Sequence, residues 1–373
     1  MIRLILIVLL FLISLLAVFK AFEYHLWLLA IGVTEFPWLF SSITILVLLT
    51  GFLGGRYIMP GTIIGIIALL LFLSPIFRAY IVAGNVRAEF DAAFGVTNTD
   101  STSAPYSFLK MFKKPVSVPF KKITYVKYAD TSMSLDFYPS QILGKKPCVI
   151  VVHGGSWAGG DSQQLPELNS FLATKGYNVA SINYRLAPKW QTPAPAEDIA
   201  NTIKYMREHA DELNIDTTKF VLIGRSAGAQ IALLAAYTMH EKDLKGVVDF
   251  YGPADMVWGY SIPSNPLIMD SRKVMDQYIG GSYTQVPQKY FDCSPLIYVN
   301  KTSVPTLIIH GSNDVLVSPE HSHRLNGALR NSGVKHYWLQ LPWATHGFDY
   351  NLNGPGGQLS TYTTLQFLNT ITR

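Results

Sequence analysis

Cysteine and charge are both scarce in this 373-residue chain. The two cysteines, Cys148 within an apolar run and Cys293 further on, provide no disulfide framework and leave the redox compartment open. Charged residues make up 15% of the chain and the mean hydropathy is +0.22, which is unusual for a soluble enzyme of this length. The composition therefore argues against a protein that is soluble throughout.

The excess of apolar residues lies before position 82, in runs over residues 2–19, 36–53 and 57–77. About twenty apolar residues cross the hydrocarbon core of a bilayer, so two or three transmembrane helices fit, and we interpret residues 1–78 as three. A further apolar stretch, residues 26–33, is too short to cross alone.

A cleaved signal peptide would explain only the first of these runs. The segment after it does not resemble a cleavage site, because Lys20, Glu23 and His25 stand where small residues are required. We therefore expect an integral membrane protein in the cell membrane. The side that carries the rest of the chain is open, since lysines and arginines divide almost equally between the two ends of the spans.

Residues 79–120 form a linker in this interpretation. VRAEFDAAFG has helical spacing with Phe90 and Phe94 on one side, TNTDSTSAP is polar and turn-forming, and YSFLKMFKKP is a short amphipathic piece. The amphipathic pieces fit an interfacial position in the membrane and equally a lid on the domain that follows.

Residues 121–373 show the alternation of an α/β domain. ITYVKY and MSLDFYP predict an antiparallel start, and CVIVVH, YNVASINY, FVLIG, GVVDFYG, TLIIHG and HYWLQL predict core strands with helices between them. Residues 253–298 interrupt this alternation with an insertion that contains several Tyr and Met residues. The insertion fits a small cap over a site and equally a loop with a minor core of its own.

The segment FVLIGRSAG contains a GxSxG turn at Gly224, Ser226 and Gly228, between an apolar strand-like run and a helix of small residues. A serine on a sharp strand-to-helix turn is held exposed, and glycines on either side relieve the crowding. The pentapeptide alone is a weak signal, so the rest of the chain has to supply partners for Ser226 as a nucleophile.

Partners for Ser226 follow later in the chain. Asp314 ends the buried run VPTLIIHGSND, and His346 lies in the loop after the run KHYWLQL. The order Ser, Asp, His is that of α/β-hydrolases. His346 would take the proton of the serine and Asp314 would hold the imidazole, with Asp249 and Asp255 as rival candidates for the acid.

An oxyanion hole is predicted from KKPCVIVVHGGSWAGGD, in which a β-branched strand runs into two glycines. Glycine lets the backbone turn its N–H groups toward a substrate carbonyl, so Gly154, Gly155 and Ser156 are candidate donors. Ala227, directly after the nucleophile, is the fourth.

These motifs together resemble the α/β-hydrolase esterases, in particular the hormone-sensitive-lipase-like and feruloyl-esterase-like bacterial carboxylesterases. The resemblance rests on HGGSW (153–157), YRLAP (184–188) with Pro195, Ala196 and Asp198, GRSAG (224–228), HGSND (310–314) and THGF (345–348). It implies an eight-stranded, mostly parallel sheet, with His153 and His310 shaping loops. The chain departs from the family at Ser156, where many relatives have a third glycine, and at Arg225, where an aspartate is usual.

The sequence thus predicts a membrane-anchored serine hydrolase that cleaves carboxylic esters through an acyl-enzyme on Ser226. An acyltransferase, an amidase or a peptidase would use the same fold and triad, and a non-catalytic binding module is a further alternative. We expect a small-molecule or lipid ester as substrate, the membrane as partner, and no nucleic acid, cofactor or metal. His321 and His323 lie together on a helix, but no third ligand joins them at useful spacing.

Overall fold

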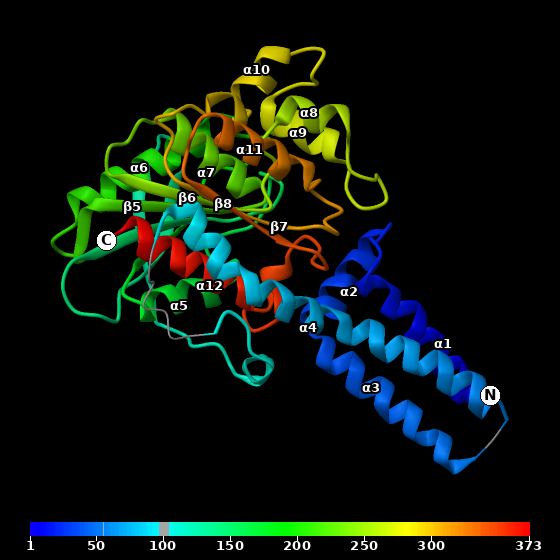
Figure 1. The fold of residues 1–373 in the computed structure, drawn as a ribbon. Coiled ribbons are helices and arrows are strands. Elements are labelled where there is room, and N and C mark those ends of the chain that lie inside the picture. The colour runs from blue at the N-terminus through cyan, green and yellow to red at the C-terminus, as the bar shows by residue number, and fades with distance from the viewer. Residues whose placement is uncertain (55, 97–103) are drawn as a thin grey trace.

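The computed structural model describes residues 1–54, 56–96 and 104–373. Its centre is one sheet in the order β1-β2-β4-β3-β5-β6-β7-β8, in which β1–β2 and β2–β4 are antiparallel and all other neighbours are parallel (Figure 1). The strands are β1 (Lys121–Lys127), β2 (Ser132–Tyr138), β3 (Lys146–Val152), β4 (Asn178–Ile182), β5 (Ile215–Arg225), β6 (Leu244–Phe250), β7 (Thr306–Gly311) and β8 (His336–Leu341). The predicted eight-stranded sheet with its antiparallel start is confirmed.

Helices cover both faces of this sheet. Successive residues of a strand face opposite sides, so in β3 Ile150 packs into one core and Val151 into the other. The first core is closed by α6 (Ala194–Glu208), α7 (Ala227–Thr238) and α11 (Glu320–Asn331); the second by α5 (Pro166–Thr174) and α12 (Pro355–Ile371). Burial on both faces explains why the central strands are almost continuously apolar.

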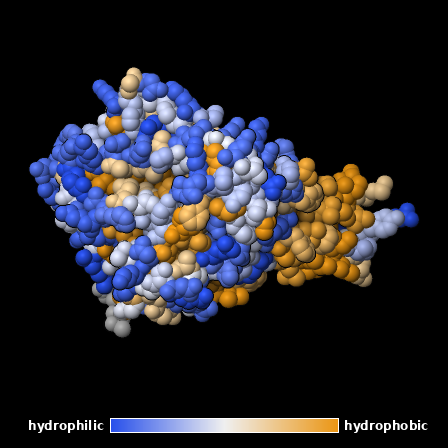
Figure 2. Space-filling model, turned by 90° about the horizontal axis from the view of Figure 1, so that it is seen from above, coloured by the Kyte–Doolittle hydropathy of each residue, from blue (hydrophilic) through white to orange (hydrophobic). Residues whose placement is uncertain are grey.

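The first 94 residues are helical wherever the structure describes them as regular. They form α1 (Ile2–Ser14), which continues as a 3₁₀ turn (Leu15–Ala17), then α2 (Tyr24–Glu35), α3 (Pro37–Leu49) with a second 3₁₀ turn (Thr50–Leu53), and α4 (Ile58–Phe94). In Figure 1 α1, α3 and the first half of α4 project from the sheet domain as a bundle, and Figure 2 shows that hydrophobic residues dominate its surface.

Of these helices, α4 is the one in the described part of the chain that is long and apolar enough to cross a membrane by itself. The pair α2 and α3 passes the same test together but is bent by 87° between its helices, and Ile2–Ala17 is a shorter apolar helix. The runs over residues 2–19 and 36–53, which the sequence analysis expects to be complete spans, therefore form helices that do not pass this test by themselves.

The third expected span does not end near residue 77. Helix α4 runs on without a break, with Pro75 inside it, and its second half lies on the sheet domain. Phe90 contacts Tyr337 of β8, with ring centroids 5.8 Å apart, and Phe94 contacts Phe367 of α12 at 5.6 Å. The first amphipathic piece of the linker is thus a helix docked on the domain, whereas most of TNTDSTSAP lies outside the described residues.

Helix α2 lies across the junction between the bundle and the sheet domain. The indole Nε1–H of Trp27 donates to the carbonyl oxygen of His346 at 3.0 Å. At the other end of the helix, Glu35 Oε2 accepts from the N–H of Gly356 at 2.9 Å, at the start of α12. The short apolar stretch of the sequence is therefore fixed to the loop after β8 and to the last helix.

The insertion over residues 253–298 consists of α8 (Met256–Ser261), α9 (Ser271–Ile279), α10 (Pro287–Asp292) and a 3₁₀ turn (Pro295–Tyr298). Tyr278 and Tyr290 are fully buried, so the insertion has packing of its own. The indole of Trp157, from the HGGSW motif, stacks on Tyr278 with ring centroids 4.7 Å apart. The insertion is thereby attached to the loop that carries the candidate oxyanion donors.

Candidate active site

Ser226 lies on the sharp turn between β5 and α7, with φ 53° and ψ −121°, a conformation that is strained for a residue with a side chain. The flanking glycines allow the close packing of this turn. A Cβ on Gly224 would collide with the backbone of Ala229, and one on Gly228 with the carbonyl oxygens of Val152 and His153. The close backbone contacts of this turn therefore require glycine at positions 224 and 228.

The structure brings Ser226, His346 and Asp314 into one hydrogen-bonded line. Asp314 Oδ2 is 2.7 Å from Nδ1 of His346, and His346 Nε2 is 3.0 Å from the Ser226 hydroxyl oxygen. A carboxylate only accepts, so Nδ1 carries the proton and Nε2 is left to accept from the hydroxyl. The three residues follow β5, β7 and β8, at the carboxyl ends of parallel strands of the sheet, where open α/β sheets form their sites.

Asp314 is fully enclosed yet remains ionised. Burial alone would raise its pKa, but His346 and His310, which donate to the carboxylate, lower the pKa below its ordinary value. His310 Nε2 lies 3.1 Å from Oδ2, and its Nδ1 accepts from the Ser322 hydroxyl at 2.6 Å. His310 thus positions the acid, a contact that the sequence analysis, which gives it a loop-shaping role, does not anticipate.

The rival acids are engaged elsewhere. Asp255 caps α8 and pairs with Arg324 at 2.8 Å. Asp249 is buried in β6, where its Oδ1 accepts from the N–H of Gly252 at 2.7 Å. Neither has a hydrogen bond to His346 in the described part of the chain.

Asp249 provides a test by pH. Burial raises its pKa to about 7, against smaller lowering effects from His310 and the Gly252 N–H. The folded protein therefore holds a proton that the unfolded chain releases near pH 4, so this group's stabilising effect is lost as the pH rises from about 4 to about 7. Between pH 5 and 8, we expect the melting temperature of Asp249→Asn to fall less than that of the native protein. If the melting temperatures of the two proteins changed with pH in the same way, the raised pKa of Asp249 would be contradicted.

The four candidate oxyanion donors differ in availability. The N–H of Gly154 donates to Gln164 Oε1 at 2.7 Å and is therefore occupied. Gly155 and Ser156 have φ values of 121° and 53°, which turn this loop backbone sharply. Within the described residues, the N–H groups of Gly155, Ser156 and Ala227 have no protein acceptor, so these three are free to bind an oxyanion.

Arg225, which replaces the usual aspartate, belongs to a buried network beneath the histidine. Its Nε donates to Asp349 Oδ2 at 2.5 Å, and the hydroxyl of Tyr251 donates to Asp349 Oδ1 at 2.5 Å. The ring of Tyr251 lies 4.3 Å from that of His346, centroid to centroid. The network therefore contacts the imidazole through the ring of Tyr251. Sequence motifs could not have predicted this contact, because Arg225 and Asp349 are 124 positions apart.

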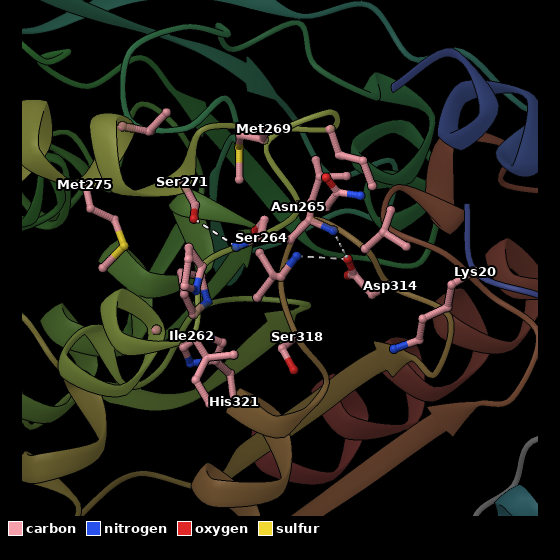
Figure 3. Close-up of a pocket in the computed structure, with 18 of the residues that line it drawn as sticks. Lys20, Ile262, Ser264, Asn265, Met269, Ser271, Met275, Asp314, Ser318 and His321 are labelled. Atoms are coloured by element: carbon pink, nitrogen blue, oxygen red, sulfur yellow. Dashed lines mark hydrogen bonds between the residues drawn. The ribbon is translucent and has the colours of Figure 1, made fainter. Parts of the chain in front are cut away.

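A cavity of about 750 Å³ opens in front of the serine. Ser226, His346 and the loop of Gly154, Gly155 and Ser156 line one side. A second cavity of about 380 Å³ is lined by Asp314, by the insertion and by residues 20–22, which precede α2 (Figure 3). Ile268, Met269 and Leu316 line both cavities and so separate them.

The two neighbouring histidines of α11 differ in environment. His321 is buried, its Nδ1 faces the N–H of Asp255 at 3.3 Å, and burial lowers its pKa to about 3. His323, whose side chain is 65% exposed, lies on the solvated face of α11, whereas His321 does not. Over residues 1–54, 56–96 and 104–373, no group of three or more His, Cys, Asp or Glu residues could hold a metal.

Comparison with known families bears directly on these motifs. Residues 135–329 match the BD-FAE family, more than half of the chain, with Ser226 and Asp314 inside the match and His346 beyond it. The chain belongs to the BD-FAE family. Together with the esterase relatives, this match places the chain in an α/β-hydrolase esterase group.

The BD-FAE chain has curated relatives among bacterial esterases. Esterase LipC of Mycobacterium tuberculosis is 29% identical over 263 residues, which cover 65% of this chain and 64% of the esterase. Esterase LipQ of the same organism is 28% identical over 218 residues, which cover 55% of this chain and 51% of that protein. The matched region thus spans between half and two thirds of these relatives.

Solved structures share the fold of this BD-FAE chain. A hyperthermophilic esterase from the archaeon Pyrobaculum calidifontis superposes with a TM-score of 0.60 at 22% identity, covering 80% of this chain and 97% of that one. A fungal esterase from Rhizomucor miehei gives 0.60 at 21% identity, covering 78% and 97%. The fold of the sheet domain is therefore that of α/β-hydrolases.

Proposed function

We propose that this chain is a serine hydrolase that cleaves carboxylic esters. The observation that carries the proposal is the line from Asp314 through His346 to Ser226, which ends beside three unoccupied N–H groups. This arrangement activates a hydroxyl and stabilises the charge that its attack creates. Family membership and esterase relatives support the same reaction class.

The geometry supports a two-step reaction. His346 Nε2 takes the proton of Ser226 as the hydroxyl oxygen bonds to the ester carbon, and the N–H groups of Gly155, Ser156 and Ala227 bind the resulting oxyanion. The imidazolium, stabilised by Asp314, then protonates the departing alcohol and leaves an acyl-serine. Water, deprotonated by His346, attacks this acyl group, and Ser226 recovers its proton as the acid departs.

Acyl transfer to another acceptor, amide hydrolysis and peptide hydrolysis use the same fold and triad. Ester hydrolysis is favoured because two of the relatives, LipC and LipQ of Mycobacterium tuberculosis, are named esterases. A non-catalytic binding module is disfavoured, because binding alone requires no activated serine beside free N–H donors.

We also propose that α1, α3 and the first half of α4 hold the enzyme in the cell membrane. Large apolar side chains are exposed on this bundle, among them Ile2, Leu9, Leu46, Ile63 and Leu70. Arg3 joins the helices at one end by donating to Thr62 at 2.9 Å, and Arg78 donates to the carbonyl of Ala17 at 2.6 Å at the other. The α4 segment from Ile58 to Arg78 is about 30 Å long, which equals the thickness of a hydrocarbon core.

The experiment combines labelling with hydrolysis in detergent-solubilised full-length protein. We expect a fluorophosphonate probe to modify Ser226, and 4-nitrophenyl esters to be hydrolysed at a rate that labelling abolishes. The protein should stay with membranes after extraction at high pH. A folded chain that neither reacts with the probe nor hydrolyses any ester would refute the enzymatic proposal, and release by alkaline extraction would refute the anchor.

A further inference from the structure

Helix α2 forms a wall of the cavity that contains Ser226. Six of the lining residues come from this helix and its junction with α3: Tyr24, Trp27, Leu28, Ile31, Gly32 and Phe36. The opposite side comes from the loops of the sheet domain and from Met269 of the insertion. The segment between α1 and α3, the helices that we propose lie in the membrane, is therefore part of the wall of the cavity.

This wall is held in place at several points. Besides the bond from Trp27 to the His346 carbonyl, the N–H of Tyr24 donates to the carbonyl of Leu267 at 3.1 Å. Asn351 donates to the carbonyl of Glu35 at 2.8 Å. These contacts join α2 to the insertion and to the loop after β8. The helix is therefore fixed relative to the catalytic side chains.

The mouth of the cavity is apolar and adjoins the bundle. Tyr24, Leu28 and Tyr350 line the cavity and are 43%, 44% and 64% exposed. Phe22, directly before α2, is 65% exposed, and its carbonyl accepts from Asn265 at 2.9 Å. Tyrosine and tryptophan favour the level of the lipid headgroups, so these residues indicate that the mouth lies at the membrane interface.

The cavity offers little to a hydrophilic substrate. Of the lining side chains in the described part of the chain, Arg225 is the one with a permanent charge, and Asp349 neutralises it. A sugar would require several hydrogen-bonding side chains, whereas α2 presents mainly hydrocarbon and aromatic surface. A hydrocarbon chain would replace water here favourably.

We propose that the substrate is an amphiphilic ester with a long aliphatic chain, which reaches Ser226 from the bilayer and lies along α2. This inference rests on the proposed ester hydrolysis and on the proposed membrane anchor, and it adds the substrate class. The aliphatic chain belongs to either the acyl or the alcohol part, because α2 lies close to both the serine and the histidine that protonates the leaving group.

Leu28 and Leu39 provide a matched pair of variants for the test. Leu28 on α2 lines the cavity and is 44% exposed, whereas Leu39 on α3 is 42% exposed and is not among the lining residues. Leu28→Ala removes apolar contact with a bound chain, so the kcat/KM ratio of long to short esters should fall by about tenfold. Leu39→Ala should keep the native ratio, and Leu28→Met, which conserves volume, should restore most of it.

The full-length protein is assayed in mixed micelles, with 4-nitrophenyl laurate against acetate for a long acyl part and dodecyl acetate against butyl acetate for a long alcohol part. Rates are divided by the amount of protein that the fluorophosphonate probe labels, so that misfolded protein does not affect the comparison. A loss confined to one pair identifies the part that contacts α2. Equal ratios for Leu28→Ala and Leu39→Ala in both pairs, or a native preference for short esters, would overturn the inference while leaving ester hydrolysis established. Absence of all hydrolysis would refute the proposed function itself.

Discussion

Replacing Ser226 by alanine is expected to lower kcat for ester hydrolysis by roughly 10⁴- to 10⁶-fold, because no other group forms the acyl-enzyme. Folding should be preserved, since alanine keeps the Cβ that the turn between β5 and α7 already accommodates. Single-turnover assays with 4-nitrophenyl acetate measure the loss, and thermal melts check the fold. Ser261→Ala, on the exposed end of α8, is the matched control and should retain native rates.

Substitutions of His346 and Asp314 should lower turnover as much as the loss of Ser226 or less. His346→Ala removes the base and should cost about as much as the loss of the nucleophile, whereas Asp314→Asn should cost less if the carboxylate mainly orients the imidazole. His310 also contacts Asp314, so it still restrains the substituted side chain. Near-native turnover in Ser226→Ala would end the proposal, and an Asp314→Asn variant weaker than His346→Ala would contradict the orienting role.

The sheet and the triad could be predicted because their signals are local. Each strand is an apolar run bounded by turn residues, and glycines at 224 and 228 are required within one turn of the chain. Parallel strands then bring their carboxyl ends to one edge, so Ser226, Asp314 and His346 meet although up to 120 positions separate them. The order of the motifs was therefore sufficient to predict that Ser226, Asp314 and His346 lie together.

The parts that escaped prediction depend on contacts without a local signal. Trp27 and His346 are 319 positions apart, and Arg225 meets Asp349 over 124 positions. Hydropathy identified the apolar stretch of α2 but not the surface on which it packs. The side chain of Gln164 likewise occupies the Gly154 N–H, which glycine content alone suggested was free.

Deleting α2 together with α1 is expected to have the second large effect. A chain that lacks residues 1–36 loses the Trp27 contact to the His346 loop and the Glu35 acceptor at the start of α12. Misplacing a catalytic group by about 1 Å can cost on the order of 100-fold, so we expect at least that loss in kcat/KM for every ester. The vacated N–H of Gly356 should also lower the thermal midpoint.

A shorter deletion separates anchoring from the shape of the site. Removing residues 1–19 takes away α1 and leaves α2 with its bonds to Leu267, His346, Asn351 and Gly356. In detergent this variant should keep most of its activity per labelled serine, since the walls of the cavity remain. Because the two deletions differ chiefly in α2, equal activities would show that this helix belongs to the anchor alone, and a large gap would show that the membrane-proximal segment completes the catalytic site.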